Sequence, residues 1–156
     1  MTQKPIPLTA EGLRHLEEEL ERLRLVRRPQ VAEEIQRARE DGGTANNAEY
    51  DAAKDEQVFV EGRIRYLENI VRNASVIPRD STPPQFIKLG CRVTLVDPDG
   101  GPAQYTIVGS AEADPRQGRI SNESPVGRTL LGHRIGDHVQ VMALGGVTSY
   151  TVVAIE

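Results

Sequence analysis

Apolar residues recur every three or four positions along the first part of the chain, which is the spacing of a helix that buries one stripe. Thr9 stands just before this series as a suitable N-cap, and Pro29 lies within it. The residues after Pro29 are out of phase with the leucines before it. We therefore predict a helix from about residue 10 to 40, with a bend or a local slip near residues 27–30. The apolar positions are Leu13, Leu16, Leu20 and Leu23, followed by Val31, Ile35 and Ala38.

A second helix is predicted after the turn-forming residues 41–47, beginning near Asn46 or Asn47. Its apolar seam alternates strictly between steps of four and three residues, which is typical of a coiled coil. The two helices cannot lie parallel, because about seven connecting residues cannot span their length. We predict an antiparallel coiled-coil hairpin over residues 1–76, with its tip at about 41–47. The seam positions of the second helix are Ala53, Gln57, Val60, Ile64, Leu67, Val71 and Ala74.

The period of the pattern changes after residue 76. A proline-containing linker at 77–85 is followed by short alternating runs that predict strands, with Asp/Gly/Pro turns between them. One short helix is predicted within Ser124–Leu131, with Ser124 as its cap and Pro125 in its first position. The fold class is therefore α+β, a long helical hairpin followed by a small antiparallel β domain over residues 86–156. The predicted strands are 92–96, 104–108, 138–142 and 148–155.

Composition narrows the function classes. The chain has 156 residues, and its net charge of −4 argues against a protein that coats nucleic acid non-specifically. No uncharged stretch approaches the roughly 20 apolar residues that a membrane span needs, and residues 1–8 lack the apolar core of a secretory signal. Cys91 is the only cysteine, which suits a reducing compartment. We expect a cytoplasmic protein that has no membrane partner.

Few residues have the spacing of a known chemical site. The three histidines show no zinc-type spacing with one another or with Cys91, and Gly42-Gly43 lacks the Lys and the preceding strand of a phosphate loop. Acidic residues do gather near the predicted turn. Carboxylates there suit Mg²⁺, although acids at the end of a solvated rod are also ordinary, and spacing alone favours that second interpretation. The acids are Glu40, Asp41, Glu49, Asp51, Asp55 and Glu56.

Several segments together resemble the GreA and GreB transcript-cleavage factors. Residues 36–57 resemble the hairpin tip of these proteins, and 47–54 (Asn-Ala-Glu-Tyr-Asp-Ala-Ala-Lys) matches the family signature. Glu61-Gly62-Arg63-Ile64 in the returning helix is similar as well. Ile120-Ser121, Ser124 to Arg128 and Leu131-Gly132 look like the C-terminal signature. The similarity covers nearly the whole chain in the right order.

The resemblance implies a fold and a partner. It implies a C-terminal domain similar to FKBP prolyl isomerases, which docks on the rim of the secondary channel of bacterial RNA polymerase. The coiled coil then reaches down the channel to the active centre and can transiently contact nascent RNA. The matching docking positions are Glu123, Ser124, Pro125, Val126, Gly127 and Arg128. The channel tip corresponds to Glu40, Asp41, Gly42, Gly43, Thr44, Ala45, Asn46 and Asn47.

The chain departs from the family at two tip positions. Cleavage factors carry an Asp and a Glu three residues apart, which help to hold a second Mg²⁺ and its water; here these positions are Gly43 and Asn46. Gly offers no ligand, and Asn offers an oxygen without charge. We therefore predict a monomeric, non-cleaving regulator that occupies the channel and inhibits the polymerase. It would be no enzyme, with no catalytic residue and no cofactor.

Two alternatives remain. One is a transcript-cleavage factor of the GreA type that uses the displaced tip acids Glu40 and Asp41, which are the only metal-ligand candidates. The other is a prolyl isomerase or holdase, which is disfavoured because isomerase pockets of this fold are rich in aromatics. Residues 76–156 offer only Phe86, Tyr105 and Tyr150.

Overall fold

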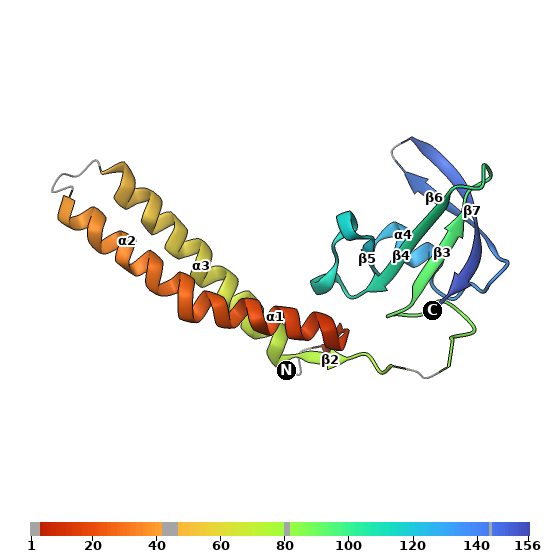
Figure 1. Cartoon of the computed structure of the whole chain (residues 1–156), viewed down its shortest axis with the longest axis horizontal. Helices are drawn as coiled ribbons and strands as arrows, with labels where there is room; N and C mark the ends of the chain where they lie inside the picture. The colour runs from red at the N-terminus through yellow and green to blue at the C-terminus, as the bar shows by residue number, and fades with distance from the viewer. Residues whose placement is uncertain (1–3, 42–46, 80–81, 144) are drawn as a thin grey trace. The chain divides into compact units, whose positions relative to one another are not determined.

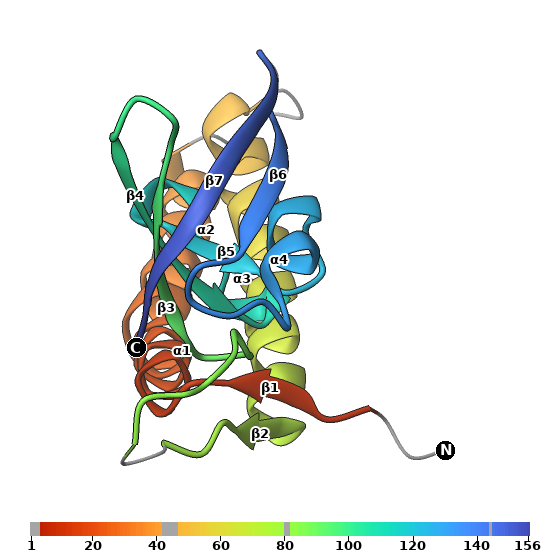
Figure 2. The ribbon, with the colours of Figure 1, turned by 90° about the vertical axis from the view of Figure 1, so that its right-hand side faces the viewer.

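Residues 4–41, 47–79, 82–143 and 145–156 are described by a computed structural model (Figures 1 and 2). The chain divides into two units. One is the helical arm, Leu13–Ala74, and the other joins the described residues up to Gly12 with Ser75–Glu156. The chain thus leaves one unit, builds the arm and returns to the same unit.

The arm is a two-stranded helical hairpin, as predicted (Figure 1). The outgoing helix of the hairpin consists of α1 (Ala10–Arg22), the π-helical turn η1 (Leu23–Arg27) and α2 (Arg28–Asp41). The returning helix is α3 (Ala48–Arg72). Apolar side chains of both helices meet along one seam, because each helix turns one stripe inward. The buried members of this seam are Leu20, Val31, Ile35, Ala53, Val60, Ile64 and Leu67.

The π-helical turn explains the shift of phase in the sequence. The leucine series would continue at residues 27, 30, 34 and 37, whereas the buried positions are Val31, Ile35 and Ala38, each one residue later than 30, 34 and 37. In η1 the Arg28 N–H donates to the Leu23 carbonyl, five residues back, so the turn takes up one extra residue. The predicted slip is therefore confirmed, and it returns α2 to the seam in phase.

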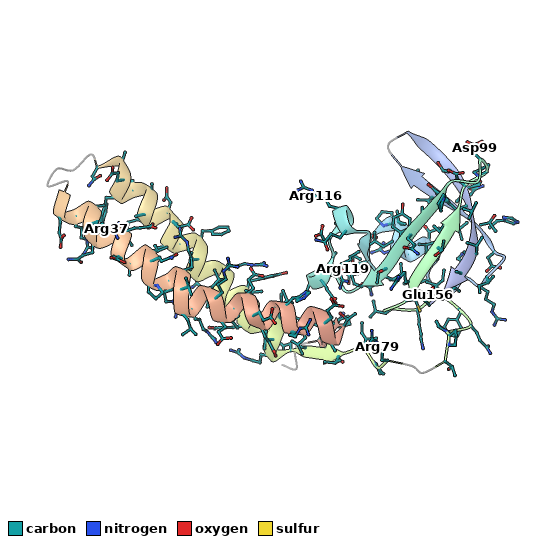
Figure 3. The ribbon with its side chains drawn as sticks, viewed as in Figure 1. Arg37, Arg79, Asp99, Arg116, Arg119 and Glu156 are labelled. Atoms are coloured by element: carbon teal, nitrogen blue, oxygen red, sulfur yellow. The ribbon has the colours of Figure 1, made fainter. Side chains whose placement is uncertain are left out.

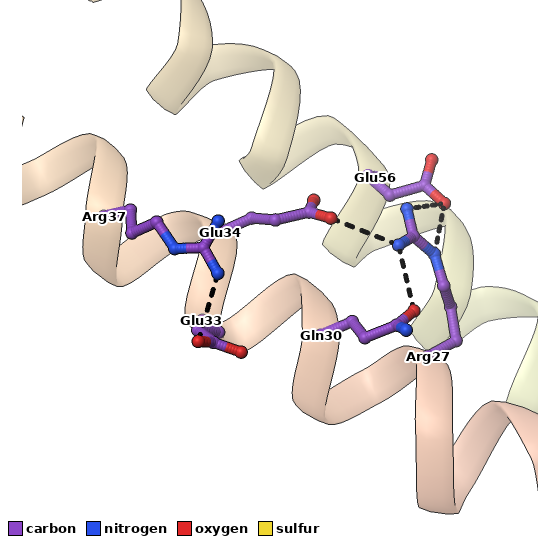
Figure 4. A network of polar contacts seen from close by, with 6 residues as sticks. All are labelled: Arg27, Gln30, Glu33, Glu34, Arg37 and Glu56. Carbon is purple, nitrogen blue, oxygen red and sulfur yellow. Dashed lines mark hydrogen bonds and ion pairs between the residues drawn. The ribbon is translucent and has the colours of Figure 1, made fainter.

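Arg–Glu pairs flank the seam on both sides. Arg27 Nη2 lies 3.0 Å from Glu56 Oε1, and the same guanidinium reaches Glu34 and Gln30 (Figure 4). Arg28 binds Glu61 through two hydrogen bonds of 2.7 and 2.9 Å, which lower the pKa of the Glu61 carboxyl. Solvent reaches these side chains, so each pair adds little to the stability of the arm. Their effect is chiefly on register, since each Arg meets its Glu at only one alignment of the helices.

The second unit is built on a five-stranded sheet in the order β5-β4-β3-β7-β6. Its pairings are antiparallel except that β4 and β5 run parallel, which the sequence did not predict. Helix α4 (Pro125–Leu130) lies against the sheet and contributes the fully buried Leu130 to an aliphatic core (Figure 2). The strands are β3 (Arg92–Val96), β4 (Pro102–Val108), β5 (Arg119–Ser121), β6 (His138–Ala143) and β7 (Gly146–Ile155).

The N-terminal segment is attached to this unit by hydrogen bonds to the carboxylate of Glu112. Strand β1 (Ile6–Leu8) pairs with β2 (Ala74–Val76), and the Thr9 amide that follows β1 donates to Glu112 Oε2 at 3.0 Å. The Thr9 hydroxyl and Arg119 (labelled in Figure 3) also bond this carboxylate. Thr9 accepts the Gly12 N–H at 2.9 Å, which confirms it as the N-cap of α1. A Cβ at Gly12 would collide with the Glu112 carboxyl, which would have to move from its place beside Thr9.

No helix in the described part of the chain combines the length and apolar character of a membrane crossing.

We predict that the seam carries the stability of the arm. Leu20→Ala should reduce the free energy of unfolding by roughly 2–4 kcal/mol, because Leu20 is only 6% exposed and its removal leaves a cavity. Leu25→Ala, at a position 68% exposed on η1, is the matched control and should change it by less than about 0.5 kcal/mol. Denaturant unfolding of both variants checks this, and equal losses would contradict it.

Candidate functional site

The far end of the arm holds the first group of predicted site residues. Helix α2 ends at Asp41 and α3 begins at Ala48. Glu40 is exposed, and its carboxylate accepts a hydrogen bond of 3.2 Å from Gln36 Nε2. The side chain of Asp41 and the predicted tip residues Gly42, Gly43, Thr44, Ala45 and Asn46 lie outside the described residues.

Asn47 joins the two helices where the tip begins. Its Oδ1 accepts the N–H groups of Glu49 and Tyr50 at 3.1 and 3.2 Å, which makes it the N-cap of α3. Its Nδ2 donates to the Ala38 carbonyl in the last turns of α2 at 2.6 Å. One side chain therefore satisfies unpaired backbone groups of both helices. The predicted helix start is confirmed, and this tie to Ala38 is a role that the sequence did not show.

Tyr50 makes a second link across the same end. The Arg39 guanidinium lies over its ring, 5.7 Å from the centroid. A hydrogen bond with Arg39 lowers the pKa of the Tyr50 hydroxyl. Asn47 and Tyr50 both come from the signature segment and both contact α2. The signature therefore holds the two helix ends at a fixed separation on either side of the connecting residues.

The acids near the tip do not form a closed metal site. Glu56 is bound by Arg27, whereas Glu49, Asp51 and Asp55 are exposed along α3. Among the described residues, no three His, Cys, Asp or Glu side chains are grouped to hold a metal ion. Glu40 is an open carboxylate at a helix end, a donor type that suits Mg²⁺ shared with another molecule.

The second group of predicted residues forms the corner between β5 and α4. Ser124 caps α4 by accepting the Gly127 N–H at 3.1 Å, and its hydroxyl donates to the Ser121 carbonyl at 2.7 Å. Glu123 accepts a hydrogen bond of 3.0 Å from the Ser110 hydroxyl. Ser110 itself lies 2.7 Å from the Ser121 hydroxyl, so two loops hold the corner in one shape.

The six predicted docking residues differ in exposure. Gly127 is buried, and a Cβ there would collide with the Ser121 carbonyl oxygen, so its role is to let α4 pack closely. Val126 is half-buried against the core. The surface of the corner is formed by the exposed side chains of Glu123, Pro125 and Arg128. Sequence reasoning missed Ser110, because no motif connects it to a segment eleven residues away.

Two family profiles match the chain. One, described as transcription elongation factor, N-terminal, matches residues 6–76. The other, described as transcription elongation factor GreA/GreB, C-term, matches residues 82–156.

Individual relatives match over the full length. A protein of Geobacillus kaustophilus named transcription elongation factor GreA is 51% identical over 155 residues, covering 99% of this chain and 98% of that protein. A protein of the same name from Bacillus cytotoxicus is 49% identical over 156 residues and covers 99% of each. The solved structure of GreA factor homolog 1 (Gfh1) of Thermus thermophilus is 33% identical, covering 98% of this chain and 99% of that one, with a TM-score of 0.46.

We predict that Asn47 has two separable effects. Asn47→Ala removes the cap and the Ala38 tie and should lower the free energy of unfolding by about 1–2 kcal/mol. Asn47→Asp keeps the capping oxygen but replaces the donor by an oxygen that the Ala38 carbonyl repels, so α3 should stay capped while the contact with α2 is lost, with faster hydrogen exchange at the end of α2. Asn69→Ala, at an exposed position of α3, is the control. Unchanged stability of Asn47→Ala would rule out the capping role.

Proposed function

The chain belongs to the GreA/GreB family of transcription elongation factors, and we propose that it acts on bacterial RNA polymerase as a factor of the GreA type that stimulates cleavage of nascent RNA. The observation that carries this proposal is the 51% identity, over nearly the whole length of both chains, to a protein named GreA. Identity to the Gfh1 protein over a similar share is 33%.

The sequence-based prediction of a non-cleaving inhibitor is wrong. It rested on two tip positions, Gly43 and Asn46, whereas full-length relatives about half identical to the chain are named transcription elongation factor GreA. The expectation that the chain is plainly no enzyme is corrected by the same finding, since factors of this type assist the RNA cleavage of the polymerase. The prediction equated the loss of two metal ligands with the loss of the cleavage activity. Two other carboxylates, those of Glu40 and Asp41, precede the two positions in the sequence.

We assign the missing carboxylate function to Glu40 and Asp41. They end α2, where the negative end of the helix dipole disfavours acids, so their position does not serve the stability of the helix. The Asn47–Ala38 tie holds this end of α2 beside the start of α3. Carboxylate oxygens at that place suit the Mg²⁺ and water of the polymerase active centre, where charge must be balanced while a nucleophile forms.

In this proposal the arm and the C-terminal domain make different contacts with the polymerase. The arm, Leu13–Ala74, enters the secondary channel as a single hairpin, and the tip meets the nascent RNA there. Residues 86–156 dock on the rim, joined to the hairpin by 77–85. The docking contact is the corner of Glu123, Pro125 and Arg128, because a rigid apolar projection between opposite charges suits a small interface. The protein acts as a monomer.

The first test concerns cleavage in backtracked elongation complexes. Glu40→Gln combined with Asp41→Asn should slow RNA shortening at least about tenfold, which corresponds to about 1.4 kcal/mol, at unchanged polymerase affinity. The matched control, Glu49→Gln with Asp51→Asn, changes the charge equally on α3 and should cleave normally. Gly43→Asp with Asn46→Glu supplies the family's own ligands and should cleave at least as fast as the natural chain. No cleavage by the natural chain above the polymerase background would contradict the proposed function.

The second test concerns docking. Glu123→Ala with Pro125→Ala should weaken binding to RNA polymerase about tenfold in a competition assay, because both side chains are exposed at the corner. Its melting temperature should stay nearly unchanged. Pro98→Ala with Asp99→Ala likewise removes one proline and one acid, from the exposed β3–β4 turn, and should bind like the natural chain (Asp99 is labelled in Figure 3). Equal affinity of the two double variants would show that the corner is not the contact.

A further inference from the structure

Helix α3 carries apolar side chains on the face that points away from the seam. Val58 and Phe59 are 69% and 68% exposed, and Tyr66 is 49% exposed. Together with Gly62 and Arg63 they line one shallow hollow. Large exposed apolar groups that gather on one face usually mark a contact surface. We call Val58, Phe59, Gly62 and Tyr66 the Phe59–Tyr66 stripe.

Gly62 lies at the centre of the stripe, and no contact among the described residues accounts for a glycine there. It is in the middle of the 25-residue α3, where glycine is the least favourable residue after proline. A Cβ at this position would meet nothing within 4 Å. Neither packing within the structure nor backbone conformation therefore requires glycine. The missing side chain leaves room for an atom group from outside, between Phe59 and Tyr66.

The surroundings of the stripe are fixed and charged. Arg63 lies 5.2 Å above the Tyr66 ring and is held by Glu19 across the arm at 2.8 Å. These contacts keep one wall of the hollow in place. On the same outward face, the exposed Asp55 lies toward the tip and the exposed Arg65 toward the base. A matching surface would present an apolar side chain over Gly62, with a basic group facing Asp55 and an acidic group facing Arg65.

We propose that the Phe59–Tyr66 stripe is a second contact with RNA polymerase, distinct from the β5–α4 corner, and that it receives an apolar side chain from the wall of the secondary channel. This inference rests on the proposed function, in which the hairpin runs inside the channel, and it assigns the outward face of α3 to the contact with the channel wall. Aromatic residues and Arg are the types that carry most binding energy in protein interfaces. The stripe would therefore fix how far, and in which rotation, the arm enters.

Substitutions at Gly62 separate binding from folding. Gly62→Ala and Gly62→Leu should both raise the melting temperature of the free protein, because both residues favour the helix more than glycine and the added Cβ meets no neighbour. Polymerase affinity should fall in the same order, slightly for Ala and at least about tenfold for Leu. Phe59→Ala should also weaken binding about tenfold at an unchanged melting temperature. Leu25→Ala, at a position as exposed as Phe59, is the control and should bind within twofold of the natural chain.

The measurement is competition binding of the full chain to purified bacterial RNA polymerase, with sedimentation of the free protein alongside. If Gly62→Leu and Phe59→Ala bind the polymerase as tightly as the natural chain does, the stripe is not a contact with the polymerase, and the proposed function still holds. No binding by the natural chain would overturn both. Self-association that Phe59→Ala abolishes, with polymerase binding intact, would assign the stripe to a second copy of this chain and overturn the inference.

Discussion

Each of the two helices of the arm must keep its apolar stripe facing the other helix along the whole length of the arm. The other features of the arm depend on this constraint. A single misplaced residue would rotate everything beyond it by about 100°. The sequence contains such a residue near Arg27, and η1 absorbs it. Because η1 restores the phase, Val31 and Ile35 reach the seam. Asn47 can then meet Ala38 at the far end.

Local rules of helix stability are kept along the seam and broken where the arm faces outward. Acids stand at the negative end of α2, and a glycine occupies the middle of α3. Neither choice helps the fold, and no contact within the described residues accounts for the glycine. Natural sequences depart from such rules mainly where a function requires it. These two departures lie where the proposed contacts with RNA polymerase lie, whereas the Arg–Glu pairs between the helices help to maintain their register.

Much of this fold follows from periodicity alone. The seam of α3 and strands β3, β4, β6 and β7 are long enough for their period to be read. Strands β1, β2 and β5 have three residues each, too few to show alternation. The contacts that hold the corner and the N-terminal segment, such as Ser110 with Glu123 and Thr9 with Glu112, join residues far apart in sequence, and no local pattern signals them. The functional error had another origin. Two ligand positions are a weaker guide to activity than the identity of the whole chain, because Mg²⁺ can take carboxylates from neighbouring positions.

The pairing of β1 with β2 makes the arm an insertion within the chain of the other unit. The chain enters the arm and leaves it at neighbouring strands, so the sheet and its core are indifferent to what lies between them. Adding seven residues to each helix would preserve the seam and lengthen the rod by about 10 Å. The length of the arm can thus change without a change in the other unit. Evolution or design can lengthen or shorten the arm in steps of one heptad and leave the sheet and its core as they are.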